Sequence, residues 1–284
     1  MTHIDQFESV FRAADKPVYS HQPLRIERVS VVTDAPAEAA ARFTNRIAEF
    51  LSVLSPAPEW STIDGDRYSS VGELLSHLEN ASPDLIVTYR HLHTEGWRWP
   101  HGLGEYLDVL TQAVPTPVLV VPHPDANFAL PHSVQNTDRT MAITDHLVGD
   151  ARLIQYAVGF TAPGGVCDLT HIEDGRAFDR WIDVISRIPE IDTEVAREKL
   201  LERLLREPQD YIARCREALR GAGVPIEIES VVRVGRRLAE YSALIDEFDV
   251  DLLVLNTKDE DQAAMHGLAH PIAVEVRQIP LLLL

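Results

Sequence analysis

Three histidines and two tryptophans crowd into one short stretch of the chain, residues 91–101. His91, His93 and His101 carry imidazole nitrogens of the kind that bind zinc. Trp97 and Trp99 could instead stack on a base or another planar ligand. The plainer interpretation is an exposed loop whose tryptophans cover one end of a sheet. It is favoured because a His-x-His pair with a distant third histidine is a weak metal signal.

Two aspartates recur at corresponding places in the two halves of the chain. Residues 29–34 and residues 140–145 are apolar, strand-like runs that both end in Thr-Asp and lead into a helical pattern. Asp34 and Asp145 are therefore equivalent. Each either contacts a ligand or caps the N-terminus of the following helix, and the pattern leaves both interpretations open.

A second landmark also occurs twice: Asp-Leu-Ile-Val at residues 84–87 and Asp-Leu-Leu-Val at residues 251–254. Each of these buried-strand runs follows an amphipathic helix. The apolar stripe of the first helix comprises Val71, Leu74, Leu75 and Leu78, and that of the second comprises Leu238, Tyr241, Ile245 and Phe248. Ser70 and Glu73 form a capping box for the first helix.

The two halves also end alike, in proline-led apolar runs at residues 117–121 and 280–284. Gly104 precedes Pro117 by thirteen residues, and Gly267 precedes Pro280 by the same thirteen. Short apolar strands that alternate with helices indicate a parallel sheet buried on both faces. The sequence therefore predicts an α/β protein with two tandem, doubly wound parallel-sheet domains.

The expected organisation is an N-terminal extension at 1–25, an abbreviated first domain at 26–122, a linker at 123–138 and a second domain at 139–284. The first domain has space for one strand near 61–64. The second is fuller, with strands at 165–171 and 225–232 and an acidic helical region at 192–220 that we expect Pro208 to interrupt.

Composition narrows the possible partners and the compartment. The 284 residues include 44 acidic and 26 basic residues, for a net charge of −18, which disfavours nucleic acid and anionic membrane surfaces. Cys167 and Cys215 form no CxxC motif, as expected in a reducing compartment. No run approaches the roughly 18 apolar residues of a membrane span, so we expect a cytoplasmic protein. Common nucleophile, Walker and zincin motifs do not occur, which disfavours an enzyme.

This order of strand-Asp, helix, Asp-Leu-Ile-Val strand, glycine loop, helix and Pro-Val-Leu-Val strand resembles the universal stress protein (UspA-like) family of the tandem type. The resemblance covers residues 27–121 and 139–284. It implies an adenine nucleotide alpha hydrolase-like, Rossmann-like fold. ATP-binding members resemble one another in a loop of Gly, two residues, Gly, nine residues, then Gly followed by Ser or Thr.

The chain departs from that loop in both halves. In the first half the corresponding positions are Tyr89, Leu92 and Gly102, followed by Leu103. In the second half they are Asn256, Asp259 and Ala269, with Gly267 displaced by two positions. Side chains at these positions obstruct a phosphate cradle, which needs glycine for close backbone approach.

By resemblance, Asp34 or Asp145 would face an adenine or ribose, and the two domains would form an intramolecular pseudo-dimer through strands 118–121 and 281–284. A homodimer and an unidentified regulatory protein partner are also compatible with the family. The preferred function is a non-catalytic stress-response sensor or regulator with degenerate nucleotide sites. The alternatives are a switch that binds ATP through Asp34, Gly102 and Gly104, with slow hydrolysis, and a metal-binding module in the His91–His101 loop.

Overall fold

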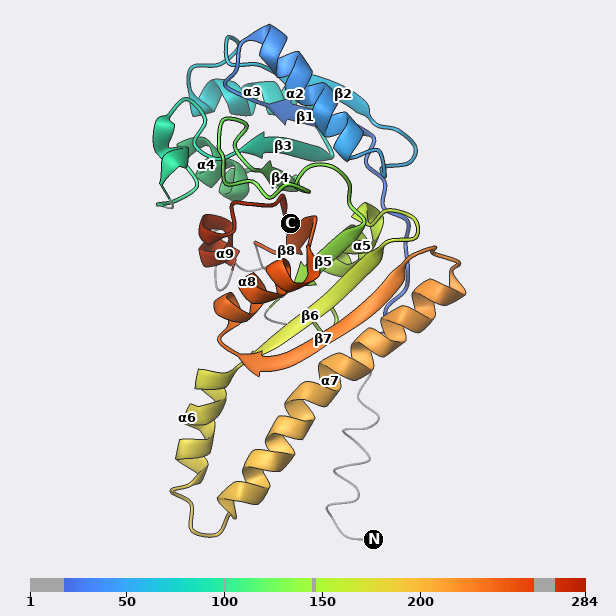
Figure 1. The fold of residues 1–284 in the computed structure, drawn as a ribbon, viewed down its shortest axis with the longest axis vertical. Helices are drawn as coiled ribbons and strands as arrows, with labels where there is room; N and C mark the ends of the chain where they lie inside the picture. Colours follow the sequence, from blue (N-terminus) through green and yellow to red (C-terminus); the bar gives the residue numbers. More distant parts are fainter. Residues whose placement is uncertain (1–17, 100, 145–146, 258–268) are drawn as a thin grey trace.

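The structure is a computed structural model that describes residues 18–99, 101–144, 147–257 and 269–284. Within these residues the chain forms one sheet of nine strands in the order β2-β1-β3-β4-β9-β8-β5-β6-β7 (Figure 1). The strands of the first half are β1 (Arg28–Val32), β2 (Glu59–Ile63), β3 (Leu85–Tyr89) and β4 (Val118–Val121). Those of the second half are β5 (Arg139–Ile143), β6 (Val166–Asp174), β7 (Glu227–Gly235), β8 (Leu252–Leu255) and β9 (Leu281–Leu283).

Helices connect the parallel strands of each half. In the first half they are α2 (Ala37–Phe50), α3 (Val71–Ala81), the 3-10 turn η1 (Glu95–Arg98) and α4 (Glu105–Ala113). In the second they are α5 (Ala151–Phe160), α6 (Gly175–Ile185), α7 (Thr193–Gly221), α8 (Arg237–Phe248) and α9 (Ala269–Glu275). The α/β prediction is confirmed. All residues of β3, β4, β8 and β9 are buried, as expected for strands covered on both faces.

The two halves share a single sheet because their last strands pair with each other. β4 runs antiparallel to β9, with Val118 opposite Leu283 and Val120 opposite Leu281. All other strand pairs are parallel. The strands of the first half therefore run in the opposite direction to those of the second half. The carboxyl ends of the two sets of strands lie on opposite sides of the molecule, at the two ends of the strands.

Local sequence signals account for several helix ends. Ser70 caps α3 by accepting from the backbone N–H of Glu73 at 3.3 Å, which confirms the capping box in part. The carboxylate of Glu73 returns to the backbone N–H of Ser69 at 2.7 Å, one residue earlier than the motif predicts. These bonds lower the pKa of Glu73.

Helices α6 and α7 form a long hairpin that extends beyond the sheet (Figure 1). The expected break at Pro208 is wrong: α7 is continuous over 29 residues with Pro208 inside it. Pro208 costs one backbone hydrogen bond, but it is buried with Tyr211, Ile212 and Cys215. Packing on that side holds the helix together where its local sequence would end it.

The strands beside the hairpin also differ from expectation at their ends. β6 continues three residues beyond position 171, and β7 spans 227–235 rather than 225–232. Their pairing runs unbroken from Val166–Glu227 to Asp174–Gly235, so each strand prolongs the other. Residues 122–138 contain no helix or strand, and their Leu130 N–H donates to Gln278 O at 3.0 Å. Among the described helices, none is both long and apolar enough to cross a bilayer.

Candidate functional site

The first half has a topological switch point, which we call the first crevice, where its strand order reverses. β1 pairs with β2 on one side and with β3 on the other, so the loops that follow β1 and β3 diverge. Open α/β sheets bind ligands at such a switch point, outside the carboxyl ends of the strands. Asp34 follows β1 and Tyr89 ends β3, so the structure brings these two predicted residues together at the expected place.

Asp34 binds groups of its own chain there. One carboxylate oxygen accepts a hydrogen bond from the Tyr89 hydroxyl, and the other accepts from the backbone N–H of His93 at 2.7 Å. Tyr89 also bonds to Thr33 Oγ1 at 2.6 Å. Asp34 does not cap α2, whose N-cap is Pro36, so the capping interpretation of Asp34 is wrong.

Burial keeps the Tyr89 hydroxyl protonated. The side chain is 1% exposed, and desolvation, followed by the hydrogen bond to Asp34, raises the pKa of Tyr89. A protonated phenol is a donor, which matches the acceptor it meets. Gly65 completes the packing, because a Cβ at that position would lie 2.2 Å from the backbone oxygen of Asp34.

Aromatic rings surround this pair. His93 packs edge-on against Tyr68, with ring centroids 4.8 Å apart, and Tyr106 lies 5.4 Å from His93. Trp97 stacks on His123 at 4.6 Å with an interplanar angle of 17°. Trp97 thus covers a side chain of its own chain, which agrees with the covering role expected for the loop's tryptophans, whereas Trp99 is 63% exposed.

The glycines of the degenerate phosphate loop have packing roles. Gly104 has φ 90° and precedes α4, and a Cβ there would lie 2.8 Å from the Cα of His91. Gly102 has φ 130° with open space around it, so its backbone conformation alone favours glycine. Leu103 is buried, at 1% exposure. Among the described residues of these loop positions, Gly102 and Gly104 keep the backbone freedom that a phosphate cradle requires.

The three histidines of the loop lie in different surroundings. His91 Nε2 bonds to the carbonyl oxygen of Gly102 at 3.0 Å, and burial lowers the pKa of His91. The His93 ring belongs to the aromatic group around Asp34, and His101 is exposed. Within the described residues, no three His, Cys, Asp or Glu side chains gather as a metal group.

The second half repeats the bridge with different residues. Asn256, directly after β8, donates from Nδ2 to the carboxylate of Asp150, in the loop after β5. Asp150 also caps α5 by accepting from Leu153 N–H at 3.0 Å. The sequence prediction missed Asp150, although its place before an apolar helical stripe marks it as an N-cap. The predicted residues Asp145 and Gly267 lie outside the described residues, as does Asp259.

The second half of the chain also bonds to the loop that follows β3. The Arg90 guanidinium, directly after β3, donates to the carbonyl oxygens of Ala273, in the last turn of α9, and of Val276, directly after α9. Arg277 Nη1 donates to the backbone oxygen of Trp97 at 3.3 Å. The loop that carries Trp97 is therefore held from both halves.

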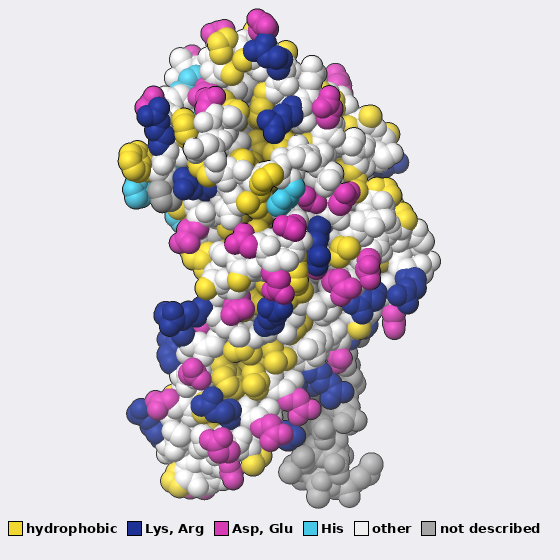
Figure 2. Space-filling view, in the orientation of Figure 1, with side chains coloured by type: hydrophobic (Ala, Val, Ile, Leu, Met, Phe, Trp, Pro, Cys, Tyr) yellow, Lys and Arg dark blue, Asp and Glu magenta, His cyan; other side chains and the backbone are white. Residues whose placement is uncertain are grey.

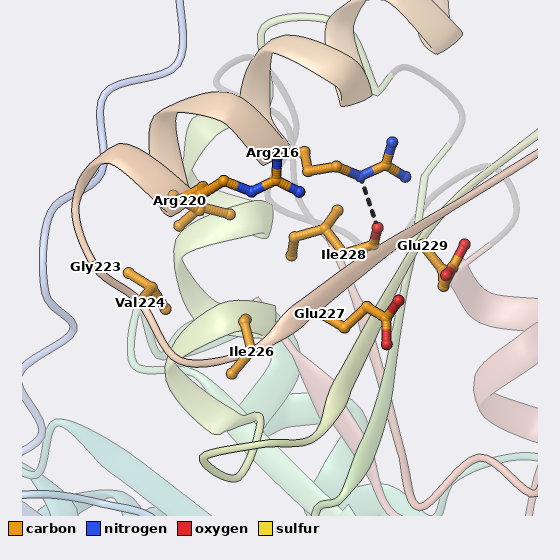
Figure 3. A pocket seen from close by; sticks show the side chains of 9 residues that line it. Arg216, Arg220, Gly223, Val224, Ile226, Glu227, Ile228 and Glu229 are labelled. Carbon is orange, nitrogen blue, oxygen red and sulfur yellow. Dashed lines mark hydrogen bonds between the residues drawn. The ribbon is translucent and has the colours of Figure 1, made fainter.

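A groove of about 720 Å³ lies elsewhere, between the end of α7 and the start of β7 (Figure 3). Arg216 and Arg220 reach over it from α7, and Glu227 and Glu229 line it from β7 (Figure 3). Arg216 Nε donates to Ile228 O at 2.9 Å, which occupies an outward carbonyl of the edge strand. The groove lies at the amino end of β7, whereas the switch point of the second half lies at the carboxyl ends of β5 and β8, so we do not assign it as the ligand site.

No protein-family model matches the sequence, and no curated protein matches it. Solved structures do. A functionally unknown protein of Pseudomonas aeruginosa PAO1 is 13% identical, with a TM-score of 0.52 over 91% of this chain and 92% of that one. A putative universal stress protein of P. aeruginosa UCBPP-PA14 is 13% identical, with a TM-score of 0.46 over 90% of this chain and 81% of that one.

A universal stress protein of Archaeoglobus fulgidus DSM 4304 is 14% identical, with a TM-score of 0.47 over 90% of this chain and 85% of that one. At these identities the similarity concerns the fold alone. The match to the P. aeruginosa PAO1 protein extends over nearly all of both chains, so the shared fold includes both halves.

Proposed function

We propose that this chain is a tandem universal stress-type regulator that acts without catalysis and whose first nucleotide-type crevice is closed by its own side chains. One observation carries the proposal: both carboxylate oxygens of Asp34 are engaged, by the Tyr89 hydroxyl and by the His93 backbone N–H. By the family resemblance, this carboxylate is the group that would meet an adenine or ribose.

Opening the crevice for a nucleotide would be costly. Asp34 would exchange two hydrogen bonds for contacts with the ligand, and the buried Tyr89 hydroxyl would lose its carboxylate acceptor and keep its bond to Thr33 Oγ1. A hydrogen bond to a charged group contributes about 1.5–3 kcal/mol, which a weak ligand would not recover. The Tyr68 and His93 rings would also have to move. These features favour a regulator over an ATP-driven switch.

The second crevice supports the same proposal less directly. Asp150 is shared between the N-terminus of α5 and the side chain of Asn256. An amide that already donates to a carboxylate is a poor substitute for the first glycine of a phosphate cradle, which contributes only backbone.

Thermal unfolding tests the proposal. Chelator-treated protein is melted with and without millimolar ATP–Mg²⁺, since a ligand at about 100 times its Kd adds about 2.7 kcal/mol to the folded state. We expect no shift. Asp34→Ala and the exposed neighbour Asp66→Ala serve as a matched pair of acids near the crevice. An ATP-dependent shift in wild type and Asp66→Ala that Asp34→Ala abolishes would replace the closed regulator with the ATP-binding switch.

A further inference from the structure

The α6–α7 hairpin carries an uncovered apolar face. Of the large hydrophobic side chains that the described residues leave exposed, all except Val18 and Trp99 lie between residues 181 and 200. Trp181 is 48% exposed, Val184 62%, Ile188 39% and Leu200 37%. On the face of the hairpin that Figure 2 presents, charged side chains of both signs surround a smaller group of hydrophobic side chains. Clustered apolar exposure of this kind marks an interaction site.

Helix geometry places these residues on one side of the hairpin. The Arg197 guanidinium lies 5.7 Å from the Phe178 ring, so both residues face the contact between α7 and α6. A residue three positions further on is turned by about 60°. Leu200 is three residues after Arg197, and Trp181 is three residues after Phe178. Because the two helices are antiparallel, these 60° rotations move Leu200 and Trp181 to the same side of the hairpin. Val184 lies on that side as well.

The chain before β1 arrives at α7 on that side. Tyr211 is three helical turns beyond Leu200 and is turned by only about 20° from it. Tyr19 is buried, at 4% exposure, and belongs to the same core cluster as Tyr211. Besides burial, Cys215, Cys167 and Tyr211 raise the pKa of Tyr19, which places its hydroxyl near these groups. Figure 1 shows the segment before β1 descending past β7 to α7.

Residues 1–17 lie outside the described part of the chain, and their sequence fits the uncovered face. Ile4, Phe7, Phe11 and Ala14 follow i, i+3, i+7, i+10 spacing, which gives one apolar stripe on a helix, with Ser9 on the opposite side. Seventeen helical residues span about 25 Å, while Tyr211 and Leu200 are separated by about 16 Å along α7. The segment is therefore long enough to reach from Tyr19 to the exposed apolar residues.

We propose that residues 1–17 form an amphipathic helix that docks on the face formed by Trp181, Val184, Ile188 and Leu200 and completes a three-helix bundle with α6 and α7. The segment would run parallel to α7 and antiparallel to α6. Phe7 and Phe11 would be its anchors, since aromatic side chains bury the most apolar area. This docking would make the hairpin a covered unit, and it is independent of whether the crevice at Asp34 binds a nucleotide.

Hydrogen exchange tests the docking in the full chain. Phe7→Glu with Phe11→Glu puts two charges on the apolar stripe, and Ser9→Glu with Ala13→Glu puts the same charge on the opposite side. We expect the amides of residues 177–188 to exchange at least about tenfold faster in the Phe7/Phe11 variant, with the Ser9/Ala13 variant behaving as wild type. Equal exchange in all three proteins would overturn the proposal.

A substitution on the hairpin tests the docking from the other side, through the protease sensitivity of residues 1–17. Trp181→Glu should speed tryptic cleavage after Arg12, whereas Arg180→Glu, a neighbour on the same helix, should not. Unchanged cleavage with Trp181→Glu would overturn the docking.

Sedimentation of the wild-type protein at several concentrations tests whether a second copy of the chain covers this face instead. A dimer in which α6 stays protected in the Phe7/Phe11 variant would assign this face to a second copy of the chain and would also overturn the proposal.

Discussion

The guanidinium of Arg90, in the first half of the chain, donates to the carbonyl oxygen of Ala273, in the second half, from Nε at 3.0 Å and from Nη2 at 2.7 Å. The same Nη2 donates to Val276 O at 2.8 Å. Arg90 is 4% exposed, and burial, with a smaller contribution from Arg277, lowers its pKa to about 9. A cation at the carboxyl end of α9 is also favoured by the helix dipole.

Replacing Arg90 should therefore loosen the junction between the halves. Arg90→Met removes the donors of two buried carbonyls, and we expect the free energy of unfolding to fall by about 2–3 kcal/mol, measured by urea denaturation. Arg98→Met is the control, because Arg98 is an exposed arginine whose ion pair with Glu95 should contribute under about 1 kcal/mol. Equal losses for the two variants would contradict the proposed role of Arg90.

Tyr89→Phe should destabilise the closed crevice. The variant removes the donor to Asp34 and the partner of Thr33 while keeping the ring, so we expect a loss of about 1–3 kcal/mol in unfolding free energy. Tyr106→Phe alters a ring of the same aromatic group that makes no bond to Asp34 among the described residues, and it should cost less than about 1 kcal/mol. A larger loss for Tyr106→Phe than for Tyr89→Phe would count against the closure.

Acid should weaken the stacked pair of Trp97 and His123. Burial lowers the pKa of His123 from its ordinary value of 6.5, although Asp125 and Asp34 oppose this, and its Nδ1 accepts from the Asp125 N–H at 3.2 Å. A lowered pKa means that the unfolded chain takes up the proton more readily. Stability is then complete above about pH 6.5 and falls as the pH drops below it.

The measurement is thermal unfolding between about pH 7.5 and pH 5.5. His123→Gln cannot titrate, so its melting temperature should fall less over this range than that of wild type. His91 has a pKa lowered in the same direction by burial, so His91→Gln should flatten the profile further. Parallel profiles for wild type and both variants would show that neither histidine is responsible.

Leu282→Ala should destabilise both halves together. Leu282 is fully buried in β9, which pairs with β4 on one side and β8 on the other. We expect a loss of about 3 kcal/mol, as for other buried leucines, in one cooperative transition followed by circular dichroism and by tryptophan fluorescence. Val195→Ala, at the exposed tip of the hairpin, should change stability by less than about 0.5 kcal/mol. Two separate transitions would mean that the halves unfold independently.

The residue patterns alone determined most of the α/β framework. Apolar runs such as 84–87 and 251–254 became β3 and β8, and the stripe at Leu74 and Leu78 became the buried face of α3. These features follow from side-chain periodicity and capping, which act between near neighbours in the sequence. The location of Asp34 beside Tyr89 followed as well, because parallel strands gather their carboxyl ends at one edge.

Only the tertiary structure decided which distant residues bond to one another and which helix faces are buried. The partners of Asp34, the bond between Arg90 and Ala273 and the pairing of Asn256 with Asp150 join residues that are 55 to 183 positions apart, beyond the reach of any local pattern. Pro208 remains helical because its neighbours are buried against the sheet, so packing outweighs a local propensity. The apolar side of the hairpin depends on the rotation of α6 against α7, which is set by the contact of Phe178 with Arg197.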